Sequence, residues 1–143
     1  MKVAIYARTA SREGNPSPAI IQQLEHLRAH VAAQGWELAA ENVFVDDGYS
    51  GGSLDRPGLE RLRARARAGQ LDSVWLTALD RLTRNPADLL LLWEELRSAG
   101  CQVRFFDDPP GWPLIDLPLL WNEIQDISRE GARRRRSHPR NSH

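Results

Sequence analysis

Four arginines and one aspartate stand near the ends of three predicted strands: Arg8, Arg56, Asp80, Arg81 and Arg84. A guanidinium is always charged, and its planar fork of donors matches the oxygens of a phosphate. Arg81 and Arg84 are three positions apart, so a helical turn would place them on one face. Asp80 could orient a guanidinium or accept a proton. The simpler alternative for LDRLTR is an exposed charged turn that caps the next helix, but four arginines at separate strand ends favour an anion site.

Hydroxyl groups lie beside these charges, and metal ligands do not. Thr9 and Ser11 follow Arg8, and Ser50 lies in the glycine-rich GYSGG loop, where it could donate a hydrogen bond to a phosphate. His26 and His30 have helical spacing but lack a third ligand nearby. The chain has one cysteine, which excludes an intramolecular disulfide and a multi-cysteine zinc site. We therefore expect phosphoryl transfer with no metal and no cofactor, in which guanidinium groups neutralise the charge.

The elements that must position these residues alternate regularly along the chain. Apolar runs predict strands over 2–6, 43–45, 73–79 and 101–106, and helical spacing predicts helices over 19–35, 56–70, 85–100 and 114–136. This order predicts an α/β fold: a mostly parallel sheet of about four strands flanked by helices on both faces, with a long C-terminal helix. The carboxyl ends of parallel strands meet at one edge, where ligands bind in such sheets.

Charge is distributed unevenly along the 143 residues. The net charge is zero, but residues 133–143 hold five arginines and no acid, so residues 1–132 carry a net charge of −5. We expect one compact domain over 1–132 and a basic, disordered tail over 133–143 that either contacts a polyanion or is simply solvated. No apolar run has the length of a membrane span or the pattern of a signal peptide, which predicts a cytoplasmic protein.

Four segments in order resemble one family. YAR at 6–8, IIQQLEHL at 20–27, DDGYSGGSLDRPGL at 46–59 and LDRLTR at 79–84 resemble the catalytic domain of the resolvase/invertase serine recombinases, over residues 2 to about 130. The resemblance implies that a serine at the end of the first strand attacks a DNA phosphodiester. A phosphoserine linkage and a free 3′-hydroxyl form, strands are exchanged, and religation needs no ATP.

The resemblance also assigns roles to residues. The phosphate-clamping arginines of the family correspond to Arg8, Arg56, Arg81 and Arg84. Its active-site aspartate corresponds to Asp80, and two supporting polar positions correspond to Gln23 and Ser50. The family pattern Tyr-x-Arg-x-Ser reads here Tyr-Ala-Arg-Thr-Ala, so Ala10 occupies the place of the nucleophile. A methyl group cannot attack phosphorus.

Ser11 is the nearest alternative nucleophile. Adjacent side chains of an extended segment point to opposite faces, so a slip of one residue would misdirect Ser11. A turn at the strand exit could bring Ser11 or Thr9 toward the cleft. Two other interpretations remain open: Ser11 caps a turn, or Ala10 is an engineered replacement of serine.

The implied partners are DNA and further copies of the chain. Arg133, Arg134, Arg135 and Arg136 could bind phosphates without sequence preference. The apolar last helix favours a homo-oligomer, a dimer or a tetramer. No pattern of a separate DNA-reading module follows, so the sequence is either a domain of a longer protein or a short homologue. The function predicted is DNA recombination or integration. The alternatives are an inactive accessory protein that binds DNA or pairs with a recombinase, and a domain that binds a small phosphorylated ligand.

Overall fold

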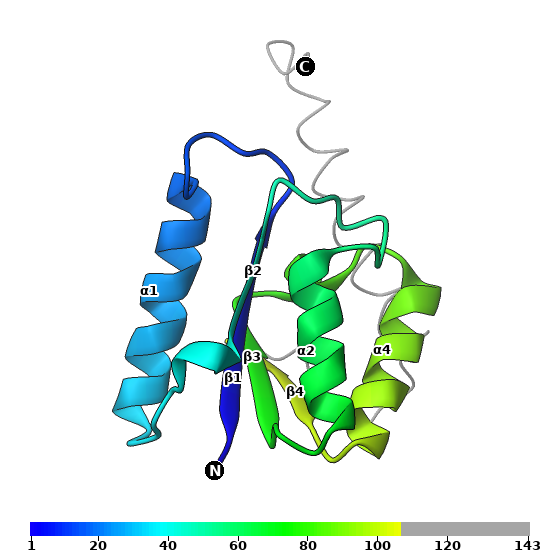
Figure 1. The fold of residues 1–143 in the computed structure, drawn as a ribbon. Helices are drawn as coiled ribbons and strands as arrows, with labels where there is room; N and C mark the ends of the chain where they lie inside the picture. Colours follow the sequence, from blue (N-terminus) through cyan, green and yellow to red (C-terminus); the bar gives the residue numbers. More distant parts are fainter. Residues whose placement is uncertain (107–143) are drawn as a thin grey trace, which may run out of the picture. The chain divides into compact units, whose positions relative to one another are not determined.

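The computed structural model describes residues 1–106, which fold into alternating strands and helices (Figure 1). The elements in chain order are β1 (Val3–Thr9), α1 (Pro18–Ala33), the 3₁₀ turn η1 (Ala40–Asn42), β2 (Val43–Asp47), α2 (Pro57–Arg67), β3 (Ser73–Leu76), α3 (Leu79–Leu82), α4 (Pro86–Ser98) and β4 (Gln102–Phe105). The predicted C-terminal helix and the basic tail with its four consecutive arginines lie outside the described residues.

The strands form one parallel sheet in the order β2-β1-β3-β4. β1 pairs with β2 up to Thr9, opposite Asp47, whereas its pairing with β3 ends at Ile5, opposite Trp75. The last residues of β1 therefore have a strand on one side only. The predicted α/β class and parallel sheet are confirmed.

Helices cover both faces of the sheet, as predicted: α1 packs on one face, and α2 and α4 pack on the other (Figure 1). Val3 and Ile5 of β1 belong to the core under α1, together with Leu27 and Val31 of that helix. Because side chains alternate along a strand, Tyr6 points to the opposite face, which α2 and α4 cover. Full burial of an aliphatic core side chain such as Ile5 contributes roughly 1.5–3 kcal/mol to stability.

Two predicted strand ends were wrong by three residues. β1 extends beyond residue 6 to Thr9, because its pairing with β2 continues through Asp47. The third strand stops at Leu76 instead of residue 79, because the chain turns into the short helix α3. Arg8 thus lies within β1 and shares a face with Tyr6.

The predicted start of the third long helix is confirmed. Asn85 is the N-cap of α4, and its side chain accepts hydrogen bonds from the N–H groups of Ala87 and Asp88, with Pro86 at the first helical position. Within residues 1–106, no helix has the length and apolar character to cross a membrane.

Candidate functional site

Arg8 lies almost fully buried at the carboxyl edge of the sheet, with 1% of its surface exposed. Its guanidinium donates three hydrogen bonds to main-chain carbonyl oxygens: Nε to Arg81 at 3.0 Å, Nη1 to Tyr49 at 2.8 Å and Nη2 to Asp80 at 2.7 Å. Tyr49 belongs to the loop after β2, and Asp80 and Arg81 belong to the short helix α3 after β3. Arg8 therefore ties these two segments of the site together.

Gly51 is required by this arrangement. A Cβ at Gly51 would lie 2.8 Å from Nη2 of Arg8 and 3.3 Å from Cγ of Arg84. The main chain of the GYSGG loop can thus pack directly on the buried guanidinium only because residue 51 has no side chain.

Arg56 is also fully buried, and it makes a second connection between the same segments. Its Nε donates to the carbonyl of Ser53 at 2.8 Å, its Nη2 to the carbonyl of Leu82, and its Nη1 to the hydroxyl of Tyr6 at 2.9 Å. Each of the three guanidinium nitrogens that are removed from water thereby has a hydrogen-bond partner, as a buried charge requires.

Asp46, at the end of β2, completes the buried network. Its carboxylate accepts a hydrogen bond from the Tyr6 hydroxyl at 2.6 Å and from the N–H groups of Gly58 and Leu59 at 2.7 and 2.9 Å. Asp46 therefore caps the N-terminus of α2, because the side chain of the N-cap residue, Arg56, makes no capping hydrogen bond. Burial, and then the bond to Asp46, raise the pKa of Tyr6 well above its ordinary value.

Gly58 allows this close approach. A Cβ on Gly58 would meet the carbonyl oxygen of Val45 at 2.7 Å and the Asp46 carboxylate at 2.8 Å. Neither Tyr6 nor Asp46 was among the predicted site residues. The sequence did offer a signal for each residue: Tyr6 places a hydroxyl-bearing ring within a buried apolar strand, and Asp46 places an acid directly after the apolar run at 43–45.

Gln23, a predicted supporting residue, lies buried on α1 and bonds to the main chain of β1. Its carboxamide oxygen accepts from the Arg8 N–H at 3.1 Å, and its nitrogen donates to the Arg8 carbonyl at 2.9 Å. The side chain thus replaces the strand partner that β1 lacks beyond Ile5.

The four predicted arginines converge. The pKa of Arg8 is lowered first by burial and then by the positive charges of Arg56, Arg84 and Arg81. Arg81 is half-buried, with Nη1 3.4 Å from the Arg8 carbonyl oxygen, and Arg84 is exposed. Within residues 1–106, none of the four forms a salt bridge to a carboxylate. The edge of the sheet therefore holds concentrated positive charge.

Arg81 and Arg84 do not share a helical face, contrary to the prediction from their spacing. α3 ends at Leu82, and Thr83 is extended with φ −164° and ψ 160°. The Thr83 hydroxyl bonds to the Gly51 carbonyl at 3.4 Å, and the Arg84 N–H bonds to the same oxygen at 3.0 Å. The chain beyond α3 follows the GYSGG loop instead of continuing the helix.

The candidate hydroxyls differ in exposure. Thr9 is 8% exposed and donates to the Ser11 carbonyl at 3.4 Å, whereas Ala10 and Ser11 are both exposed just after β1. Ser50 is exposed too, and its hydroxyl accepts the Gly52 N–H at 3.0 Å within a turn. Asp80 is exposed, and Arg8 bonds to its carbonyl oxygen, not to its carboxylate.

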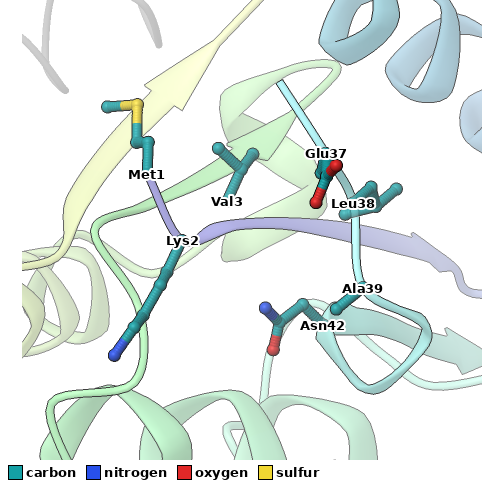
Figure 2. A pocket seen from close by; sticks show the side chains of 7 residues that line it. All are labelled: Met1, Lys2, Val3, Glu37, Leu38, Ala39 and Asn42. Carbon is teal, nitrogen blue, oxygen red and sulfur yellow. The ribbon is translucent and has the colours of Figure 1, made fainter. Parts of the chain in front are cut away.

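A cavity of about 480 Å³ lies at the other edge of the sheet, where β1 begins (Figure 2). It is lined by residues 1–3, residues 37–39 and Asn42, and so contains none of the site residues. The candidate site is instead an open, charged surface at the carboxyl edge. Within residues 1–106, no group of three or more His, Cys, Asp or Glu side chains is placed to hold a metal ion.

Comparison with solved structures supports the fold over most of the chain. The N-terminal catalytic domain of TP901-1 integrase has 26% sequence identity, a TM-score of 0.71, and coverage of 91% of this chain and 98% of that domain. A resolvase family site-specific recombinase from Streptococcus pneumoniae has the same fold, with a TM-score of 0.69, 22% identity, and coverage of 93% and 91% of the two chains.

Comparison with curated proteins gives relatives of one kind. Transposon Tn3 resolvase of Escherichia coli is 42% identical over 71 residues, which are 50% of this chain and 37% of the relative. Transposon Tn21 resolvase of the same species is 32% identical over 102 residues, 68% of this chain and 54% of the relative. The chain thus spans between a third and little over half of these relatives.

The family model described as "Resolvase, N terminal domain" matches residues 3–117, which is most of the chain. That range contains both residues of the buried Tyr6–Asp46 pair and the four arginines of the site, which we call the arginine cluster: Arg8, Arg56, Arg81 and Arg84. The resemblance expected from four short motifs is therefore confirmed, and the chain belongs to the resolvase N-terminal domain family, the catalytic-domain family of the serine recombinases.

Proposed function

We propose that this domain cleaves and rejoins DNA strands through a phosphoserine linkage, with Ser11 as the nucleophile. The observations that carry the proposal are the convergence of four guanidinium groups, none of them salt-bridged to a carboxylate within residues 1–106, and an exposed serine two positions beyond the end of β1, the strand that carries Arg8. Such a surface binds a phosphodiester and stabilises the charge that develops on its oxygens during in-line displacement.

The reaction conserves the number of ester bonds. The Ser11 oxygen forms a bond to phosphorus, the bond from phosphorus to the 3′-oxygen breaks, and that oxygen leaves as a hydroxyl. The proton lost by Ser11 must therefore be accepted by a base, and one must be supplied to the 3′-oxygen. We assign Asp80 as the acceptor, because its carboxylate is exposed at the same edge of the sheet, and solvent water supplies the proton to the leaving 3′-oxygen. Religation reverses these steps and needs no ATP.

The arginines divide into two kinds within this proposal. Arg81 and Arg84 retain solvent exposure, so they contact the phosphate directly. Arg8 and Arg56 use their donors on protein groups, so they act by holding the loops and by adding positive charge beneath the phosphate. Gln23 fixes the end of β1, and Ser50 supplies a hydrogen bond to the phosphate.

One observation favours the inactive alternative. Ala10 takes the position that the family resemblance gives to the nucleophile, and its methyl group is exposed where a hydroxyl would be needed. In that case the domain binds DNA or pairs with an active recombinase as an accessory protein. The buried network would then preserve only the fold and the cationic surface.

A nicked suicide DNA substrate separates these functions. We expect a covalent protein–DNA adduct on a denaturing gel that Ser11→Ala abolishes and Thr9→Ala retains, because Thr9 is buried. An adduct that survives Ser11→Ala would disprove the assignment. If the wild type forms none but Ala10→Ser does, the domain with Ala10 is inactive in cleavage, which contradicts the assignment of Ser11 and favours the accessory function.

The other expectations remain proposals from family membership. They are phosphate binding by Arg133 to Arg136, assembly into a homo-oligomer, participation in DNA integration, a cytoplasmic location, and activity without metal or cofactor. Chemical cross-linking with and without DNA tests the assembly into a homo-oligomer. Retention of cleavage in excess chelator tests the activity without metal.

A further inference from the structure

Asp47 is the last residue of β2, and both of its carboxylate oxygens accept hydrogen bonds from Ser17, thirty positions earlier in the chain. Oδ2 accepts the Ser17 N–H at 2.9 Å, and Oδ1 accepts the Ser17 hydroxyl at 2.7 Å. The Ser17 groups hold the pKa of Asp47 below its ordinary range, so the carboxylate is charged at neutral pH. This pair fastens the start of α1 to the end of β2.

Ser17 is positioned to cap α1, yet its hydroxyl does not do so. It is the N-cap residue and is 1% exposed, but its side chain makes no bond to an N–H group of the helix. The hydroxyl instead donates to Asp47 and accepts the Glu13 N–H at 2.9 Å. A serine at an N-cap usually accepts a hydrogen bond from its own helix. Here the Ser17 hydroxyl bonds instead to Glu13 in the preceding loop and to Asp47 at the end of β2.

The loop of residues 10–17 is consequently held at both ends by the end of β2. At its start, the Thr9 carbonyl accepts the N–H groups of Gly48 at 2.8 Å and Tyr49 at 3.1 Å. At its end lies the Ser17–Asp47 pair. Ser11 is located between these two attachments.

We propose that the Ser17–Asp47 pair positions the Ser11 hydroxyl beside the arginine cluster. This inference rests on the proposed function, in which Ser11 attacks a phosphodiester. Displacement of a nucleophile by about 1 Å can reduce a rate on the order of a hundredfold, and Ser11 is exposed, so the loop attachments must supply the positional restraint. Asp47 and Ser17 are therefore positioning residues, since they act through the loop.

Asp47→Asn and Ser17→Ala test the inference in the full chain, with Ser17→Thr as the variant that keeps the hydroxyl. Asp72→Asn is the matched control, because its carboxylate also accepts a main-chain N–H, that of Lys2 at 2.7 Å, at the opposite edge of the sheet. We expect amide hydrogen exchange at Glu13 and Ser17 to rise by about tenfold in Asp47→Asn, the effect of losing roughly one hydrogen bond. Exchange within β1 should not change.

The rate of adduct formation at saturating DNA should fall about tenfold or more in Asp47→Asn and Ser17→Ala. DNA affinity should not change, and Ser17→Thr should restore the rate. Faster exchange with an unchanged rate would overturn the positioning role and leave the proposed function intact. An equal fall in Asp72→Asn would also overturn it, because the effect would then be general destabilisation. A wild type without any adduct would overturn the proposed function, and the inference with it.

Discussion

The carboxamide of Gln23 brackets the main chain of Arg8, accepting its N–H at 3.1 Å and donating to its carbonyl at 2.9 Å. A side chain on α1 thereby supplies both bonds that a neighbouring strand would make. These two bonds fix the main chain of β1 at Arg8, close to the loop of residues 10–17 that carries the candidate nucleophile.

Gln23→Ala should lower the free energy of unfolding by roughly 2 kcal/mol, because it leaves the buried Arg8 N–H without a partner and leaves the Arg8 carbonyl only the longer contact with Nη1 of Arg81 at 3.4 Å. Urea denaturation measures the change. Gln22→Ala is the control, since Gln22 is exposed and adjacent, and it should change stability by no more than about 0.5 kcal/mol. Equal effects of the two substitutions would show that the bracket contributes nothing.

Tyr6 should fail to ionise while the protein stays folded. Its folded pKa is raised, so the stability gained from the protonated hydroxyl is present below the unfolded pKa of about 10 and is lost as pH rises beyond it. In Tyr49→Phe, which leaves Tyr6 as the one tyrosine, tyrosinate absorbance should appear only together with unfolding. Reversible ionisation near pH 10 without loss of circular dichroism would contradict the buried network.

Gly51→Ala should destabilise the protein by about 1–3 kcal/mol, the usual cost of overpacking a filled site. The added Cβ would lie 2.8 Å from Nη2 of Arg8, a guanidinium held by three carbonyl groups. In Gly52→Ala the nearest atom is the Ser50 hydroxyl at 3.4 Å, so this neighbour is the matched control. Thermal unfolding of both variants gives the comparison, and a similar shift in the two would count against the packing argument.

Arg81→Ala and Arg84→Ala should each weaken DNA binding and reduce the slope of log affinity against log salt by about 0.7 to 0.9, the value of one phosphate contact. Arg97→Ala serves as the control, because Arg97 is exposed at the end of α4 and pairs with Glu94. Filter binding across a salt series measures the slopes. If all three variants keep the wild-type slope, the arginine cluster is not the phosphate site.

The sequence by itself determined the alternation of the four strands with the long helices, the parallel sheet and the family. Local patterns suffice for these, because apolar runs, the Asn85–Pro86 helix start and the four motifs each consist of residues that are close together in the sequence. The same patterns brought the arginines to one edge, because parallel strands end together.

Only the tertiary structure decided which arginines are buried and which are exposed. Both Arg8 and Arg81 stand near the end of a predicted strand, but Arg8 lies beneath the loop after β2 and the short helix α3, and Arg81 lies on that helix. That difference comes from contacts between residues 41 to 73 positions apart, which no local pattern encodes. The Tyr6–Asp46 bond and the Ser17–Asp47 pair have the same origin, because each joins segments that only the assembled sheet brings together.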